Sequence, residues 1–243
     1  AEVELRQGEP AKAEKRARDV VSQNPKLAIG HSILGDIAMA RNQVPSAIDA
    51  YRRAHEIQPD TTSLLRLYRA MSAQDSGKPA LQLAEQWLKS NPKDLAVHKA
   101  LADGHARAGS FALAKVAYAG ALKLKPGDAE LLNNLANVQL RLKDPDAVKT
   151  AEAALANAPG NALVIDTLGW ALFQNGQADR ALQVLRDARL RLPGNPEIRY
   201  HLAVVLAQTG RKTEAREELD HALKSGVDFE SISQAKTLAA SLR

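Results

Sequence analysis

The chain has 243 residues, of which 45% are hydrophobic, so it can bury a substantial core in globular domains or along a repeat array. The formal net charge is +5, but 33 basic residues are interspersed with 28 acidic ones and aromatics make up only 4%, which disfavours nucleic acid as a partner. Cysteine is absent, which excludes disulfides without identifying the compartment. No run approaches the roughly 20 apolar residues of a membrane span, and the opening AEVELRQGEP lacks the apolar core of a signal peptide, so we expect a soluble fragment.

Prolines recur along the chain at almost constant spacing. Pro25, Pro59, Pro92, Pro126, Pro159 and Pro193 each follow an apolar run and precede another, 33 or 34 residues apart. Proline cannot continue a helix, and the polar residues beside it can cap the next one, so each proline marks a helix boundary. A second set, Pro10, Pro45, Pro79 and Pro145, suits the first turn of a second helix. Each unit is therefore predicted to be helix, turn, helix, and helices this short need stacked neighbours for stability.

In chain order, residues 1–25 contain only the second half of a unit, with Ala13 and Ala17 as its small contact residues, so we expect the array to begin upstream. Full units are predicted at 28–59, 61–92, 95–126, 129–159, 162–193 and 196–227. We expect irregular packing in 61–92, where Tyr68 and Trp87 replace small residues, and in 129–159, which is one residue short between its helices. Residues 228–243 are predicted to form a last helix that covers the end of the stack with the stripe Phe229, Ile232, Ala235, Leu238 and Leu242.

The units resemble the tetratricopeptide repeat, which carries large apolar residues at positions 4, 7, 11 and 24, small ones at 8, 20 and 27, and proline at 32. Residues 162–193 fit best, with Ile165, Leu168, Gly169, Leu172, Ala181, Leu185, Ala188 and Pro193 in those places. The resemblance implies an all-α, right-handed superhelical α-solenoid of helix-turn-helix units, in which residues 1–243 form a single array closed by a C-terminal capping helix.

Catalytic signals are missing from the sequence. No two of the six histidines form a metal motif such as HExxH, and no GxSxG, phosphate-binding or dinucleotide-binding fingerprint occurs. Asp36, Asp103 and Asp166 lie one or more repeats apart, too far for paired acid and base work. We therefore expect no enzyme, no cofactor and no metal site.

In tetratricopeptide repeats the first helix of each unit lines a concave groove through positions 2, 5, 9, 12 and 13. The resemblance implies that a protein or peptide partner binds there, to groove residues Asp36, Met39, Lys99, Asp103, Arg107, Asn133, Asn137, Arg141, Asp166, Trp170, Phe173, Gln174, Tyr200 and Gln208. Any single polar member could equally be part of a solvated helix face. Asn133, Asn137, Asp166 and Trp170 fall at matching heights in adjacent units and could together hold an extended peptide. Position 9 places Trp170 in the groove, although a register error of one would bury it.

Two finer expectations concern the partner. The carboxylate clamp of chaperone-binding repeats is not reproduced, because Asp103, Leu163 and Thr167 stand where its polar residues belong. Residues 162–227, with DTLGW and PEIRYHLA, resemble the terminal repeats of the bacterial lipoproteins that accompany PEP-CTERM and exosortase systems. That resemblance implies a periplasmic scaffold, lipid-anchored upstream of this fragment and linked to exopolysaccharide production. An alternative is a polysaccharide-associated module, in which Trp170, Phe173 and Tyr200 stack on sugar rings.

Overall fold

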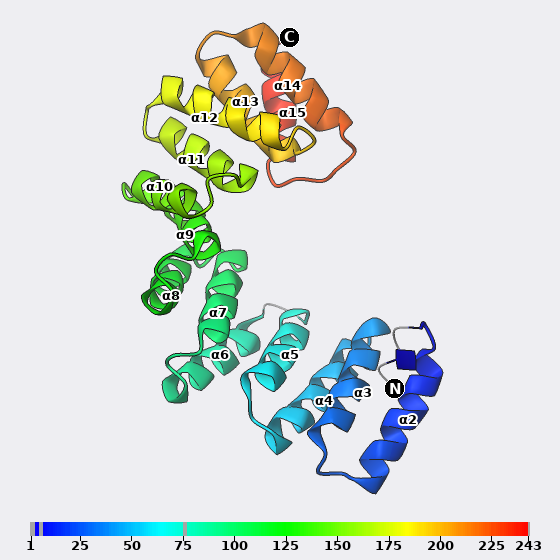
Figure 1. The fold of residues 1–243 in the computed structure, drawn as a ribbon. Helices are drawn as coiled ribbons and strands as arrows, with labels where there is room; N and C mark the ends of the chain where they lie inside the picture. Colours follow the sequence, from blue (N-terminus) through cyan, green and yellow to red (C-terminus); the bar gives the residue numbers. More distant parts are fainter. Residues whose placement is uncertain (1–2, 5–6, 75–76, 243) are drawn as a thin grey trace. The chain divides into compact units, whose positions relative to one another are not determined.

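The computed structural model describes residues 3–4, 7–74 and 77–242, and the described part contains fourteen helices and no strand, an all-α helical repeat fold (Figure 1). The helices are α2 (Pro10–Gln23), α3 (Ala28–Ala40), α4 (Val44–Ile57), α5 (Thr61–Ser72), α6 (Lys78–Ser90), α7 (Leu95–Arg107), α8 (Phe111–Leu124), α9 (Ala129–Arg141), α10 (Ala147–Asn157), α11 (Ala162–Gln174), α12 (Ala178–Arg191), α13 (Pro196–Gln208), α14 (Lys212–Lys224) and α15 (Ile232–Ser241). None of the described helices is long and apolar enough to cross a membrane.

Proline positions mark the helix boundaries as their spacing predicts. All six prolines of the main set lie between two helices, and Pro10, Pro45 and Pro79 stand in the first turns of α2, α4 and α6. The prediction for Pro145 is wrong, because this proline lies in the turn before α10, whose N-cap residue is Asp146. The unit is not short between its helices, contrary to the expectation: the link 142–146 is longer than the link 108–110 between α7 and α8, and the shortening falls on α10, which has 11 residues against 14 in α8.

Paired helices approach closely where a small residue occupies position 8. A Cβ atom built on Gly35 of α3 would lie 2.4 Å from a ring carbon of Tyr51 in α4, and one built on Gly169 of α11 would lie 2.6 Å from Leu185 in α12. Both distances are shorter than carbon atoms tolerate, so the two glycines set the separation of these pairs.

The large residues of the 61–92 unit are accommodated by partners in α7. Tyr68 is buried, its hydroxyl donates to the carbonyl of Ala100 at 2.8 Å, and Gly104 leaves room for it, since a Cβ there would lie 2.1 Å from the tyrosine oxygen. Trp87 is partly buried and its indole N–H donates to Asp94 at 2.8 Å. The predicted irregularity is thus a specific set of contacts among α5, α6 and α7.

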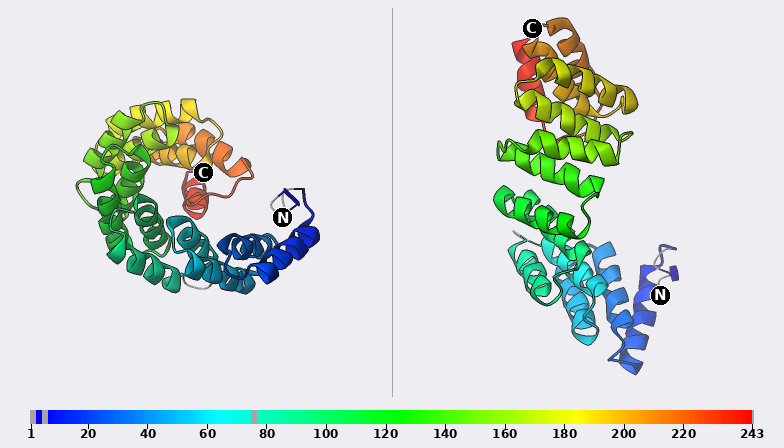
Figure 2. Two further views of the ribbon diagram at one scale, coloured as in Figure 1. Left: turned by 60° about the horizontal axis from the view of Figure 1, so that its bottom comes forward. Right: turned by 60° about the vertical axis from the view of Figure 1, so that its left-hand side comes forward.

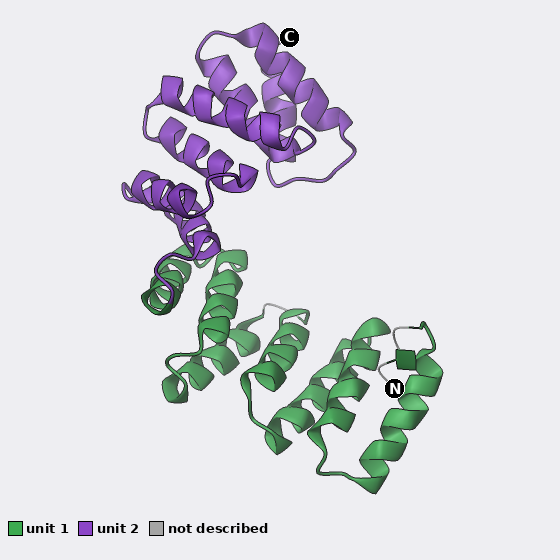
Figure 3. Cartoon of the chain, viewed as in Figure 1, with its two compact units in different colours: residues 1–124 green, residues 125–243 purple. Residues whose placement is uncertain are grey.

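The helices form two compact units, residues 1–124 and residues 125–243, each with its own buried residues (Figure 3). Unit 1 runs from α2 to α8 and unit 2 from α9 to α15. A single array over residues 1–243 stays a prediction.

At the end of unit 2, α15 packs on α14, and Figures 1 and 2 show it beside α13 and α14. Ala235 and Leu242 of the predicted stripe are buried in the unit 2 core, and Phe229 and Leu238 pack against that core partly buried. On another surface of the unit, the buried carboxylate of Glu218 in α14 binds Arg189 of α12 and Arg199 of α13, which fastens three helices together.

Candidate functional site

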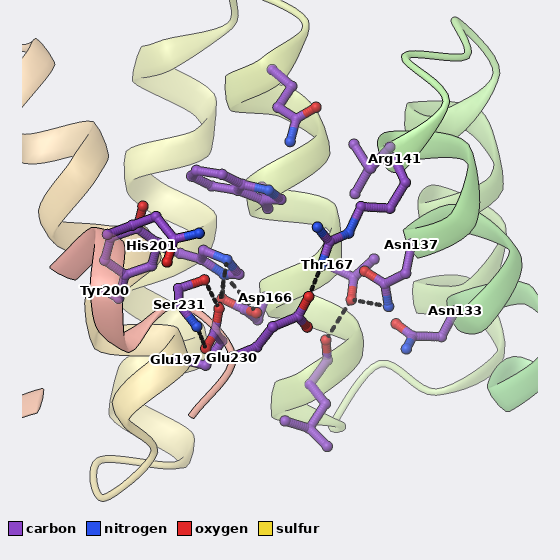
Figure 4. Close-up of a pocket in the computed structure, with 15 residues that line it drawn as sticks. Asn133, Asn137, Arg141, Asp166, Thr167, Glu197, Tyr200, His201, Glu230 and Ser231 are labelled. Atoms are coloured by element: carbon purple, nitrogen blue, oxygen red, sulfur yellow. Dashed lines mark hydrogen bonds and ion pairs between the residues drawn. The ribbon is translucent and has the colours of Figure 1, made fainter. Parts of the chain in front are cut away.

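Unit 2 contains a hollow of about 500 Å³, which we call the unit 2 groove (Figure 4). Its walls come from the first helices of three successive pairs and from the segment that leads into α15. The lining residues are Asn133, Asn137, Leu140 and Arg141 of α9; Leu163, Asp166, Thr167, Trp170 and Gln174 of α11; Glu197, Tyr200 and His201 of α13; and Glu230, Ser231 and Gln234 at the C-terminal end.

Helical spacing explains why these side chains share one surface. Asn133, Asn137 and Arg141 are four residues apart, as are Asp166, Trp170 and Gln174. Residues at i, i+4 and i+8 lie on one face of a helix, one above the other. The helices α9 and α11 therefore each present a row of side chains to the groove. The row on α9 is polar, and the row on α11 has the indole of Trp170 between two polar residues.

An ionisable network crosses the floor of the groove. Asp166 is only 7% exposed, and both of its carboxylate oxygens lie 3.0 Å from Nδ1 of His201. The other ring nitrogen of His201 lies 3.5 Å from Glu197, which accepts hydrogen bonds from the backbone N–H and the hydroxyl of Ser231 at 3.1 and 2.5 Å. Asp166 thus lines the hollow, and its carboxylate orients His201; that it binds a partner stays a prediction.

Trp170 belongs both to the groove and to the packing of unit 2. Its indole is partly buried against the core and stacks on the ring of His201, with centroids 4.2 Å apart and an interplanar angle of 15°. Phe173 also stacks on it at 5.2 Å, and Tyr200 is tilted against it at 6.4 Å. Burial, helped by the negative charge of Glu197, raises the pKa of Tyr200, so its phenol stays protonated at neutral pH.

The remaining wall, α9, supplies amides and one cation. Asn137 is exposed and its amide donates weakly to Thr167 at 3.4 Å, while the buried Oδ1 atom of Asn133 has no hydrogen-bond partner among the described residues. Arg141 forms an ion pair with Glu230, which reaches it from the C-terminal segment (Figure 4).

Seven of the predicted groove residues line this hollow: Asn133, Asn137, Arg141, Asp166, Trp170, Gln174 and Tyr200. Two others in unit 2 do not, namely Gln208 and Phe173, and the latter packs against the core. The predicted set lacks the other eight lining residues, Leu140, Leu163, Thr167, Glu197, His201, Glu230, Ser231 and Gln234. The helical stripe gives a signal for Glu197 and His201, which are four residues apart on α13, but nothing in the repeat pattern places the C-terminal segment against the groove.

The predicted groove residues of unit 1 lie on α3 and α7, where two carboxylates are already engaged. Asp36 accepts a hydrogen bond from the hydroxyl of Tyr51 at 2.7 Å, and Asp103 accepts one from Tyr118 at 2.5 Å. The repeat places aspartate at position 9 and tyrosine at position 24 in both pairs, so these carboxylates tie the two helices of a pair together. Burial and the neighbouring carboxylate raise the pKa of Tyr51, which keeps it a donor.

Three predicted residues of unit 1 remain. Met39 packs against the core of α3, α4 and α5, while Lys99 is partly buried and Arg107 is exposed on α7. No group of three or more His, Asp or Glu side chains suited to a metal ion occurs in the part of the chain that the structure describes. The expected lack of a cofactor and of catalysis stays a prediction.

Comparisons with known proteins give one consistent result. Two family models described as tetratricopeptide repeat match residues 172–242 and residues 1–60 with 99–162. No curated protein matches the sequence significantly.

Several solved structures share the fold at low sequence identity. A tetratricopeptide repeat protein from Parabacteroides merdae ATCC 43184 is 14% identical with a TM-score of 0.71, and the match covers 98% of this chain and 94% of that one. A chain of the APC/C hetero-tetramer Cut9–Hcn1 is 18% identical with a TM-score of 0.69, and the match covers 97% of this chain but only 46% of that one. MamA from Desulfovibrio magneticus RS-1 is 21% identical with a TM-score of 0.55, over 73% of this chain and 96% of that one.

These structures share the helical repeat, and the second family model alone covers more than half of the residues. The chain therefore belongs to the tetratricopeptide repeat family.

Proposed function

We propose that this protein is a non-catalytic interaction scaffold that binds an extended segment of a partner protein in the unit 2 groove. Tetratricopeptide repeat proteins generally mediate protein–protein interactions. The observation that carries the proposal is the lining of the groove, where amide, hydroxyl, guanidinium and aromatic groups from three successive first helices converge on one hollow.

An extended peptide matches the geometry of these walls. Packed helices lie roughly 8–10 Å apart, and an extended chain advances about 3.3 Å per residue, so neighbouring walls are about three peptide residues apart. Asn137 and Gln174 can each donate and accept, as the N–H and C=O groups of a peptide backbone require. Leu163, which is 50% exposed, offers the groove an apolar contact at the start of α11.

The polysaccharide reading receives less support from the aromatic residues. A sugar ring stacks on an open aromatic face, but His201 covers one face of Trp170 at 4.2 Å, and Phe173 packs on the same indole. A glycan would have to displace a ring that Asp166 holds in place. We therefore rank a peptide partner above a glycan.

The finer context rests on sequence resemblance alone. DTLGW and PEIRYHLA motivate the proposal that the intact protein is a periplasmic, lipid-anchored component of an envelope assembly linked to exopolysaccharide production and PEP-CTERM sorting. A pull-down from a native envelope with the intact chain tests it, and recovery of only unrelated partners would contradict it.

A matched pair of alanine variants tests the groove. Peptides selected from a random library against the chain should bind Asn137→Ala about three- to tenfold more weakly, because one or two hydrogen bonds are lost without loss of packing. Lys149→Ala, an exposed position on α10, is the control and should leave affinity unchanged. Fluorescence anisotropy measures both. Equal affinity of Asn137→Ala and wild type, or binding of neutral or acidic glycans with no peptide binding, would overturn the proposal.

A further inference from the structure

The segment between α14 and α15 lies across one end of the unit 2 groove (Figure 4). We call residues 228–231 the strap. Residues 224–228 are all exposed, and Gly226 has a φ of 69°, so the chain leaves α14 as an unpacked link. Phe229 then packs partly buried against the core, and Ala235 and Leu242 fix α15 farther along. Two polar residues of the strap, Glu230 and Ser231, thus line the groove between the apolar anchors Phe229 and Ala235.

These two adjacent residues bind opposite walls. The carboxylate of Glu230 pairs with Arg141 of α9, while Ser231 donates its backbone N–H and its hydroxyl to Glu197 of α13. The α11 wall, with Trp170, lies between them in the chain order of the repeats. The strap therefore makes the contacts across the groove that an extended ligand bound there would make.

The contacts of the strap can be exchanged for those of another chain. The side chains of Arg141 and Glu230 are 53% and 70% exposed, and an ion pair this open shifts an equilibrium by about fivefold at most. Arg141 is the one Lys or Arg among the described lining residues, whereas the lining carboxylates Asp166 and Glu197 already bind His201 and Ser231. A carboxylate of the partner could therefore pair with Arg141 of α9, and an N–H or hydroxyl group of the partner could donate to Glu197 of α13.

From this geometry we infer that the strap is an internal competitor for the groove, and that the partner segment carries an acidic residue followed by a serine or threonine. This inference rests on the proposed function. The partner's carboxylate takes the place of Glu230 on Arg141, and its following N–H and hydroxyl take the place of Ser231 on Glu197. The helix α15 stays docked through Ala235 and Leu242 throughout the exchange.

A peptide with the sequence of the strap itself is the direct probe. Fluorescein-labelled VDFESIS, residues 227–233, is titrated with the full chain in an anisotropy assay. Wild type should bind it weakly, because only the fraction of molecules with an open strap is competent. Glu230→Gln combined with Ser231→Ala should bind it about tenfold more tightly, since the ion pair and the hydroxyl hydrogen bond to Glu197 are lost and only the backbone N–H bond of residue 231 is kept. Adding Arg141→Gln should remove that gain, and the peptide VDFQSIS should bind the double variant more weakly than VDFESIS.

Controls separate competition from unfolding. Glu217→Gln removes an exposed acidic group on α14 and should leave affinity unchanged. Glu230→Gln alone, at a side chain that is 70% exposed, keeps the fold intact and should tighten binding about threefold. If VDFESIS bound wild type and both strap variants equally, the inference that the strap competes for the groove would be wrong. If library-selected peptides bound but VDFESIS did not, the inference that the partner segment carries an acidic residue would be wrong. If neither kind of peptide binds any variant, the proposed function fails as well.

Discussion

Gly169 sets the contact between α11 and α12 at the level of single atoms. A methyl group at this position would lie 2.6 Å from Cγ and 2.8 Å from Cδ2 of Leu185, a side chain that is fully buried. Overpacking of a dense core costs about 1–3 kcal/mol, so Gly169→Ala should lower the free energy of unfolding by that amount in urea denaturation. Gly194→Ala is the matched control, because no heavy atom lies within 4 Å of its added Cβ and its φ is not positive. A Gly169→Ala variant as stable as the control would contradict the close approach.

The register of the repeat places side chains on a helix but does not say which groups they bind. Trp170 lines the unit 2 groove and also packs against His201 and the core. Position 9 of the repeat holds Asp36 and Asp103 in unit 1, and there a tyrosine of the following helix takes the carboxylate. In the repeat 162–193, position 9 is Trp170 and position 24 is Leu185, so the aspartate and its tyrosine partner are replaced together. A pattern that assigns each repeat position separately does not predict such a pair.

At the scale of elements, Asp94 joins α5, α6 and α7 through one carboxylate. It accepts from the backbone N–H of Val97 as the N-cap of α7, from the indole of Trp87 and from the hydroxyl of Thr61 at 2.6 Å. Burial alone would raise the pKa of Asp94, but these hydrogen bonds outweigh it and hold the pKa below its usual value. The carboxylate is therefore a stabilising contact among three helices.

This pKa shift predicts the direction of a pH dependence. Because the folded pKa is depressed, the ionised carboxylate contributes stability above the unfolded value of about 3.9, and the contribution is lost as pH falls through the folded pKa. Asp94→Asn keeps an oxygen that can cap Val97, but its NH2 group replaces Oδ2, the acceptor for both Trp87 and Thr61, so it should cost about 1–3 kcal/mol at pH 7. The difference from wild type should shrink as pH falls below about 4. Urea denaturation across pH measures it, with the exposed Asp49→Asn as control; a pH-independent difference would exclude the charge as its cause.

Helix ends could be read from the sequence because proline and glycine act locally, through their own backbone geometry. Pro145 failed as a marker because α10 begins only at Ala147, so the link between α9 and α10, residues 142–146, is longer than the corresponding link 108–110 between α7 and α8. The contacts of the strap could not be predicted from the sequence. The apolar stripe of residues 229–242 predicts which face of α15 is buried, but it does not predict that Glu230 and Ser231 line the groove. That information lies in long-range contacts to α9 and α13, for which periodicity carries no signal.

At the scale of the whole molecule, stability should be distributed along the chain and respond locally to substitution. Helices of a repeat contact mainly their neighbours, so the stability of such proteins is approximately a sum of repeat and nearest-neighbour contributions. Each of the two compact units has its own buried core. Gly35→Ala and Gly169→Ala introduce the same kind of clash, one per unit, at 2.4 Å and 2.6 Å from their nearest atoms. The two variants together test whether unfolding is local, because each variant disturbs one unit and leaves the other as its control.

Hydrogen exchange followed by mass spectrometry should resolve the two variants by position. Gly35→Ala should speed amide exchange in α3 and α4, by about fivefold or more for each kcal/mol lost, and leave α11–α14 unchanged. Gly169→Ala should do the reverse, because the opening that exposes an amide need only unpack the damaged pair and its neighbours. If either variant accelerated all helices equally, the chain would unfold as one cooperative two-state body, and its stability could not be a sum over repeats.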